Sequence, residues 1–82
     1  MSIILYTKNG CPWCDEVRVL LQEKNVSFEE RECRNNTDHF EELVKKSGQT
    51  LTPTLDIDGE ILADSDAEQV GEYFKKKGVP GF

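Results

Sequence analysis

The chain has 82 residues, of which 37% are hydrophobic and 32% charged, and its formal net charge is -6 at pH 7. This length suits one compact domain with a thin core, so residues 1–82 are expected to form a single domain. The acidic balance and the lack of a basic face argue against nucleic acid as a partner. No apolar stretch is long enough for a membrane span, so no membrane association is expected.

Cysteine usage indicates chemistry and not a structural framework. The sequence begins without the basic region, apolar segment and cleavage site of a signal peptide, so the expected compartment is the cytoplasm. Disulfide frameworks are rare there, and two of the 3 cysteines are close together in the sequence. These thiols are interpreted as reactive groups. The protein is expected to be a monomer.

Hydrophobic periodicity predicts alternating strands and helices in the first half of the chain. Residues 2–6 form a nearly all-apolar run, typical of a buried parallel strand, and residues 7–10 form a turn. A helix apolar on one face follows over residues 12–25. Residues 26–30 alternate as a second strand, so the two strands are expected to be parallel.

The middle of the chain predicts a second helix and a hairpin. A polar loop over residues 31–36 precedes the helix, which Gly48 ends. Pro53 opens a third strand, and the Asp58-Gly59 pair is a strong signal for a tight turn into a fourth, antiparallel strand.

The last predicted element is a helix that begins at a capping box. Ser65 with Glu68 gives the capping-box spacing, and Gly78 marks the helix end. The predicted order is β-α-β-α-β-β-α, which indicates an α/β domain with a four-stranded mixed sheet and three helices available for both faces.

Cys11 and Cys14 stand at the turn between the first strand and the first helix, which favours a nucleophilic first sulfur. Pro12 suits the first helical position, so Cys11 falls at the N-cap, beside unpaired backbone N–H groups. The helix dipole favours the thiolate by up to roughly 2 kcal/mol, which lowers the pKa of the Cys11 thiol by about 1.5. We expect Cys14 to point inward and Trp13 to stay exposed. A purely structural disulfide here would close too short a loop to stabilise the chain much.

Three segments of the chain resemble the glutaredoxins, which have a thioredoxin-like fold. They are residues 7–14 (TKNGCPWC), the Thr52-Pro53 step that opens the third strand, and residues 63–66 (ADSD) at the start of the last helix. Trp13 replaces a common Tyr, and Ala63-Asp64 replaces a frequent Gly-Gly. The resemblance covers nearly the whole chain and implies a thioredoxin-like fold.

The resemblance implies a glutathione-dependent thiol-disulfide oxidoreductase. Cys11 would attack a disulfide, Cys14 or glutathione would resolve the mixed disulfide, and glutathione would be the co-substrate. The expected partners are glutathione and proteins that carry disulfides or glutathione mixed disulfides. The residues expected to bind glutathione are Lys8, Trp13, Leu51, Thr52, Pro53, Ser65 and Asp66.

Several of these residues have a physical role in the implied site. Lys8 would hold the Cys11 anion or a glutathione carboxylate. A cis proline at Pro53, facing the cysteines, would leave the backbone of Thr52 free to pair with a bound peptide. The helix start at Ser65 and Asp66 would attract the γ-glutamyl carboxylate, with Asp66 receiving its ammonium group.

Two other functions remain open from the sequence. A redoxin reduced by thioredoxin reductase and serving ribonucleotide reductase would share the fold and the cysteine motif. A zinc-binding or non-catalytic adaptor module would use the pattern C-x2-C-x18-C-x5-H, which runs from Cys11 to His39.

We expect no metal, since the predicted strands and helices can build a core without one. Cys33 is then expected in a polar loop, as a bystander or a site of glutathionylation, and His39 on a helix surface. Pro12 stiffens the cysteine turn, which argues against iron-sulfur binding.

Overall fold

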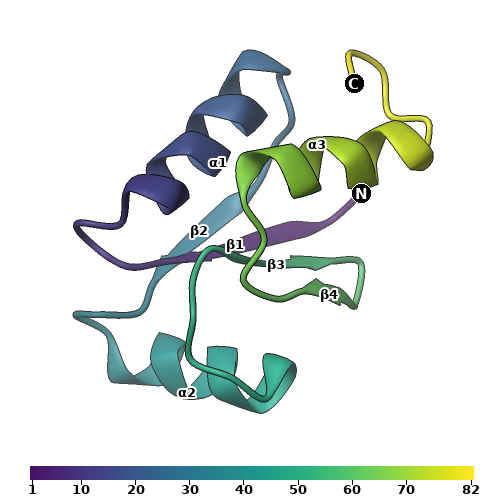
Figure 1. Cartoon of the computed structure of the whole chain (residues 1–82). Coiled ribbons are helices and arrows are strands. Elements are labelled where there is room, and N and C mark those ends of the chain that lie inside the picture. The colour runs from purple at the N-terminus through teal and green to yellow at the C-terminus, as the bar shows by residue number, and fades with distance from the viewer.

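The computed structural model describes residues 1–82, and its seven elements follow the predicted order. They are β1 (Ile3–Thr7), α1 (Pro12–Glu23), β2 (Glu29–Glu32), α2 (Thr37–Ser47), β3 (Thr54–Ile57), β4 (Glu60–Leu62) and α3 (Ala67–Lys76). The strands form one mixed sheet in the order β2-β1-β3-β4, in which only β1 and β2 are parallel. Helices α1 and α3 cover one face and α2 covers the other (Figure 1). The predicted fold class is confirmed.

Each face of the sheet has its own hydrophobic cluster. The main cluster, under α1 and α3, consists of Ile3, Leu5, Val17, Leu21, Leu55, Ile57, Val70 and Phe74. The small cluster, under α2, consists of Tyr6, Cys33 and Leu43. Neighbouring residues of a strand point to opposite faces, so Leu5 enters the main cluster and Tyr6 the small one. This division places α1, which carries the cysteine pair, on the better-packed face.

The second strand was predicted at the wrong position. It begins at Glu29 and not at Val26. Val26 and Phe28 are half-buried against the main cluster, so their alternation marks a packed connection and not strand pairing. Arg31, predicted in a loop, belongs to β2, which is an edge strand rich in charged side chains. Hydrophobic alternation cannot locate a strand whose side chains are held by ion pairs.

The cap of the last helix was also predicted at the wrong residue. Asp66 and not Ser65 is the N-cap of α3, and its carboxylate accepts a hydrogen bond from the Gln69 backbone N–H at 2.9 Å. The Gln69 side chain accepts one from the Asp66 N–H at 3.0 Å, which completes a capping box. Ser65 is buried, with its N–H bound to the Pro53 carbonyl. The sequence allows a capping box with either Ser65 and Glu68 or Asp66 and Gln69. The hydrogen bond from the Ser65 N–H to the Pro53 carbonyl selects the second.

The predicted helix end at Gly48 and the tight turn at Asp58-Gly59 are confirmed, whereas α1 ends at Glu23 and not at residue 25. Gly48 ends α2 in the left-handed conformation, with φ of 71°. Asp58 and Gly59, with φ of 51° and 92°, form the tight turn between β3 and β4. No helix is long and apolar enough to cross a membrane.

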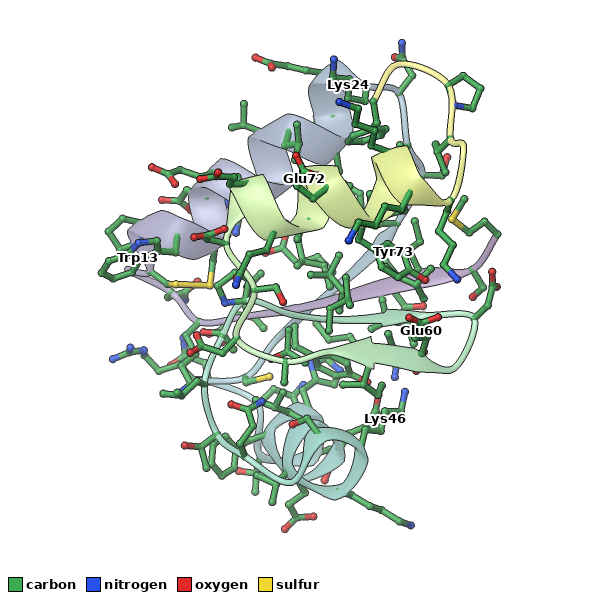
Figure 2. All side chains as sticks on the ribbon, turned by 45° about the vertical axis from the view of Figure 1, so that its right-hand side comes forward. Trp13, Lys24, Lys46, Glu60, Glu72 and Tyr73 are labelled. Atoms are coloured by element: carbon green, nitrogen blue, oxygen red, sulfur yellow. A yellow bond between two sulfur atoms is a disulfide. The ribbon has the colours of Figure 1, made fainter.

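A polar network holds α2 against the sheet. The buried Tyr6 hydroxyl donates to the Glu42 carboxylate, which also pairs with Arg31 of β2. Lys46 donates to Asp56 of β3 at 2.9 Å, and Figure 2 shows its side chain between α2 and the sheet. The Tyr6 hydroxyl and Arg31 lower the pKa of Glu42, and Lys46 lowers that of Asp56. The network therefore compensates for the small size of the cluster beneath α2.

The sign of the pH dependence follows from these lowered pKa values. In the unfolded chain such carboxylates titrate at about pH 4. The folded state binds its protons less readily, so the network stabilises the fold above that pH. The contribution is lost as the pH falls through the folded-state pKa values.

We expect the substitution Glu42→Gln to lower the free energy of unfolding by about 1 kcal/mol at pH 7, because it removes the ion pair with Arg31. The difference in unfolding free energy between the parent and this variant should narrow as the pH falls below about 4, because the parent loses this contribution as the pH falls through the lowered folded-state pKa of Glu42. Urea unfolding of both proteins at pH 7 and at pH 3 measures this difference. The control is Glu41→Gln, since Glu41 is exposed and has no ion pair. A gap that is equally large at pH 3 and pH 7 would contradict this account.

Candidate functional site

The two cysteines of the C-x-x-C pair lie at the N-terminus of α1. Cys11 is its N-cap, with extended backbone, and its Sγ accepts a hydrogen bond from the Cys14 backbone N–H at 3.2 Å. Pro12 occupies the first turn, as predicted. Cys11 is half-buried and Cys14 fully buried, and the two form a disulfide with a Cα–Cα distance of 5.2 Å. Only the first sulfur is therefore open to a partner.

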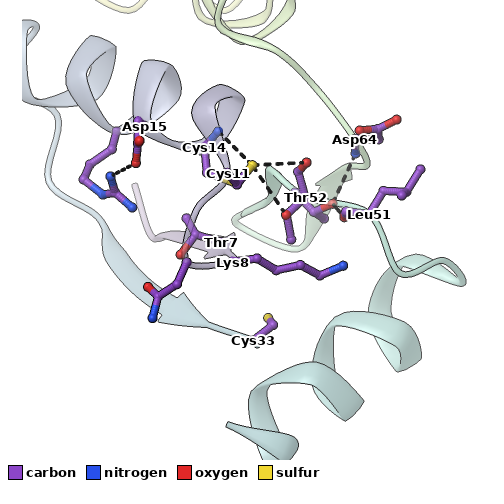
Figure 3. Close-up of a disulfide and its surroundings, with 12 residues drawn as sticks. Thr7, Lys8, Cys11, Cys14, Asp15, Cys33, Leu51, Thr52 and Asp64 are labelled. Carbon is purple, nitrogen blue, oxygen red and sulfur yellow. Dashed lines mark hydrogen bonds and ion pairs between the residues drawn. A yellow bond between two sulfur atoms is a disulfide. The ribbon is translucent and has the colours of Figure 1, made fainter. Parts of the chain in front are cut away.

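The loop before β3 faces the sulfur of Cys11. The Thr52-Pro53 peptide bond is cis, as the resemblance implied. The Thr52 hydroxyl and carbonyl oxygens each lie 3.9 Å from Cys11 Sγ (Figure 3). Asp64, just before α3, donates its backbone N–H to the Thr54 hydroxyl at 3.1 Å. Three segments distant in the sequence thus meet at the disulfide.

Two hollows lie beside the cysteine turn. The acidic hollow, of about 330 Å³, is lined by Trp13, Thr52, Pro53, Asp64, Asp66 and Gln69. The basic hollow, of about 400 Å³, is lined by Lys8, Cys33, Arg34, Thr37 and Phe40. Each borders the turn directly: Trp13 stands between the two cysteines, and the Cys11 N–H donates to the Lys8 carbonyl at 3.2 Å. The site is therefore flanked by carboxylates on one side and cations on the other.

Lys8 lies in the basic hollow and not on the sulfur. Its ammonium group donates to the Thr50 carbonyl at 2.6 Å and lies 5.9 Å from the centre of the Phe40 ring. It makes no hydrogen bond to Cys11, and Figure 3 draws no contact between them. The expected contact of Lys8 with the Cys11 sulfur is therefore not made here, and its other expected role, holding a glutathione carboxylate, stays a prediction.

The remaining predicted residues divide between the acidic hollow and its surroundings. Trp13, 61% exposed, lines that hollow together with Thr52, Pro53 and Asp66. Leu51 is 53% exposed but lines neither hollow. The hydroxyl of Ser65 donates to the Ala63 carbonyl at 3.4 Å, and Ser65 lines neither hollow.

The sequence did not mark five of the lining residues as site residues, namely Arg34, Thr37, Phe40, Asp64 and Gln69. Asp64 takes a positive φ of 49°, and it and Gln69 line the acidic hollow next to the α3 cap. Arg34 lines the basic hollow. The pair Asp66-x-x-Gln69 fits a capping box and was a usable signal for Gln69. Nothing local marks Arg34, since its closeness to Lys8 arises only when β1 and β2 pair.

Cys33 lies in a loop, as predicted, but its side chain is buried. Cys33 follows β2 but is only 3% exposed and packs in the small cluster with Tyr6 and Leu43. Its burial raises the pKa of its thiol to about 11. A polar sequence context concealed this because the apolar partners come from β1 and α2.

The zinc pattern is not assembled by the fold. His39, expected on the surface, is half-buried, and its Nδ1 lies 3.1 Å from the Glu32 carbonyl oxygen. No group of three or more His, Cys, Asp or Glu side chains is arranged to hold a metal ion. Cys33 lies apart from the disulfide of Cys11 and Cys14, in the cluster beneath α2.

Comparison with known proteins identifies the family. The glutaredoxin family model matches residues 3–62. Glutaredoxin 3 of Escherichia coli K12 is 37% identical over 65 residues, which cover 79% of this chain and 78% of that protein. Glutaredoxin 1 of Rickettsia conorii is 43% identical over 68 residues, which cover 80% of this chain and 67% of that protein.

Solved structures share the fold. The thioredoxin-like protein BC3987 superposes with a TM-score of 0.78 at 31% identity, covering 85% of this chain and 96% of that one. A buckwheat glutaredoxin, solved as a complex with glutathione, shares the fold with a TM-score of 0.70 at 20% identity, over 93% of this chain and 69% of that one. The chain therefore belongs to the glutaredoxin family and is a thiol-disulfide oxidoreductase with Cys11 and Cys14 as its redox-active pair.

Proposed function

We propose that this protein uses glutathione as its electron donor and reduces protein disulfides and glutathione mixed disulfides in the cytoplasm. The observation that carries the proposal is the position of Cys11 Sγ. It caps the positive end of α1, is open to solvent, and stands between an acidic and a basic hollow. This arrangement suits a small peptide with carboxylates at both ends and one amino group.

Glutathione has that distribution of charges. Its glycine carboxylate fits the basic hollow, beside Lys8 and Arg34. Its γ-glutamyl amino group fits the acidic hollow, beside Asp64 and Asp66, and its second carboxylate fits the N-terminus of α3. The cysteinyl residue between them would then lie along Thr52, next to Cys11 Sγ.

The proposed reaction balances two electrons at each stage. The Cys11 thiolate attacks one sulfur of a protein disulfide, forming a mixed disulfide and releasing one protein thiolate, which takes a proton. The Cys14 thiol then loses its proton and attacks Cys11 Sγ, releasing the second protein thiolate and leaving the Cys11–Cys14 disulfide. Two molecules of glutathione reduce that disulfide and leave as glutathione disulfide. With a glutathione mixed disulfide as substrate, one further glutathione replaces Cys14 in the second step.

Reduced Cys11 is expected to titrate below the value of about 8.5 that an ordinary cysteine has, because the helix N-terminus and the Cys14 N–H stabilise the thiolate. The ultraviolet absorbance of the thiolate, followed against pH in the reduced protein, measures this pKa. The Cys11→Ser variant supplies the baseline. A midpoint at or above 8.5 would mean that the helix terminus does not activate this sulfur.

The cysteine variants test the proposed roles. Cys11→Ser should abolish all glutathione-coupled reduction, because the nucleophile is lost. Cys14→Ser should keep the reduction of glutathione mixed disulfides and lose that of protein disulfides, since only the latter requires a second protein thiol. Steady-state assays with both substrates, coupled to glutathione reductase, give the rates. Regeneration by thioredoxin reductase but not by glutathione would instead favour the alternative redoxin.

The basic hollow is tested by removing its cations. Lys8→Gln and Arg34→Gln should each raise the KM for glutathione about two- to fivefold, which corresponds to an exposed ion pair of up to about 1 kcal/mol. The matched control is Lys45→Gln, because Lys45 is an exposed cation of α2 outside both hollows. Equal KM values in all four proteins would exclude this hollow as the carboxylate site.

A further inference from the structure

An apolar groove with an acidic rim runs along α1, outside the two hollows. It has a volume of about 360 Å³ and is lined by Asp15, Glu16, Val19, Leu20, Glu23 and Ala67. Val19 is 47% exposed, although it is a large aliphatic residue in the middle of a helix. The main cluster does not require it, because Val17 and Leu21 supply the buried face of α1. We call this surface the α1 groove.

The charged residues that line the α1 groove are all acidic. Three of its lining residues are acidic and none is basic. Asp15 is paired with Arg18 at 2.6 Å, but Glu16 and Glu23 have no hydrogen bond or ion pair through their side chains. Lys24, just past the helix end, lies against the Phe82 ring, 5.8 Å from its centre. Two carboxylates therefore stand unpaired beside the exposed Val19 and the half-buried Leu20.

The α1 groove continues from the redox site. Trp13 and Asp66 line the acidic hollow, while their near neighbours Asp15 and Ala67 line the groove. Figure 2 shows Trp13 at the end of α1 that carries the cysteines, with α3 lying alongside and bearing Glu72. A substrate chain whose disulfide-bonded cysteine lies at Cys11 can thus extend past Trp13 into the groove.

We infer that the α1 groove binds a cationic segment of the protein substrate, with lysine or arginine side chains on Glu16 and Glu23 and an aliphatic residue on Val19 and Leu20. This inference rests on the proposed function, because it names a class of substrate for the same site. Charge complementarity selects this occupant: the rim would repel glutathione, which is an anion, and attracts a cation. The groove thus discriminates among protein substrates and leaves glutathione binding to the hollows.

The geometry sets where the cations must lie in the substrate. Helix α1 rises about 1.5 Å per residue, so the groove from Asp15 to Glu23 is about 12 Å long. An extended peptide covers this in about four residues, and two more bridge the first turn of the helix. The basic residues are therefore expected about three to six positions from the disulfide-bonded cysteine.

Two synthetic peptides test the inference. Both carry a glutathione mixed disulfide on one cysteine, with a leucine and two lysines (cationic peptide) or two glutamines (neutral peptide) at those positions. The groove variant is Glu16→Gln with Glu23→Gln. The control is Glu41→Lys on α2, where Glu41 is exposed. The groove variant and the control variant each raise the net charge of the protein from -6 by 2. Glutathione-coupled assays give kcat/KM for each peptide with each protein.

The ratio of kcat/KM for the cationic peptide to that for the neutral peptide should exceed one in the parent. It should fall about three- to tenfold in the groove variant, as expected for two exposed ion pairs, and stay at the parent value in the control. Added salt should lower the ratio in the parent more than in the groove variant.

Each contrary result has a separate meaning. A ratio that falls equally in both variants would be an effect of net charge alone and would overturn the inference. A ratio of one in the parent, with both peptides reduced, would overturn the inference and leave the proposed function intact. If the parent reduces neither peptide with glutathione, the proposed function itself fails, and the inference fails with it.

Discussion

The structure depends on one interaction, in which a sulfur atom occupies the N-cap of α1. Helices usually begin at an oxygen-bearing side chain that accepts a backbone N–H. Here Cys11 Sγ accepts the Cys14 N–H, and Pro12 removes a donor that would otherwise need a partner. The interaction that begins the helix is therefore also the one that favours a negative charge on this sulfur. The buried Cys14 and Val17 keep that end of the helix fixed on the sheet.

Burial separates the three cysteines into different chemical groups. Cys11 is half-buried at a helix terminus, whereas Cys33 lies in the small cluster with a pKa raised to about 11. Desolvation favours the neutral thiol, so Cys33 stays protonated at neutral pH even though it borders the basic hollow. The protein thus holds a third thiol beside the basic hollow without offering a competing thiolate.

The two faces of the sheet differ in what stabilises them: one has the larger hydrophobic cluster, and the other has a small cluster and a network of charged side chains. Helices α1 and α3 share the main hydrophobic cluster and hold the cysteine turn, the acidic hollow and the α1 groove. Helix α2 packs Leu43 in the small cluster, is bound to the sheet by the network of Tyr6, Glu42 and Arg31, and borders the basic hollow. Acidic and basic surfaces consequently lie on opposite sides of the same sulfur.

The sequence by itself determined the element order, the cap at Cys11 and the tight turn at Asp58-Gly59, because these follow from periodicity, helix-end chemistry and turn preferences within a few residues. Only the tertiary structure decided the register of β2, the choice of Asp66 as the cap of α3 and the burial of Cys33. It also built both hollows, since each joins side chains from segments far apart in the chain. Local sequence patterns reflect the conformation that each residue prefers. The residues that it contacts across the sheet depend instead on strand pairing and on which side chains pack into the hydrophobic clusters.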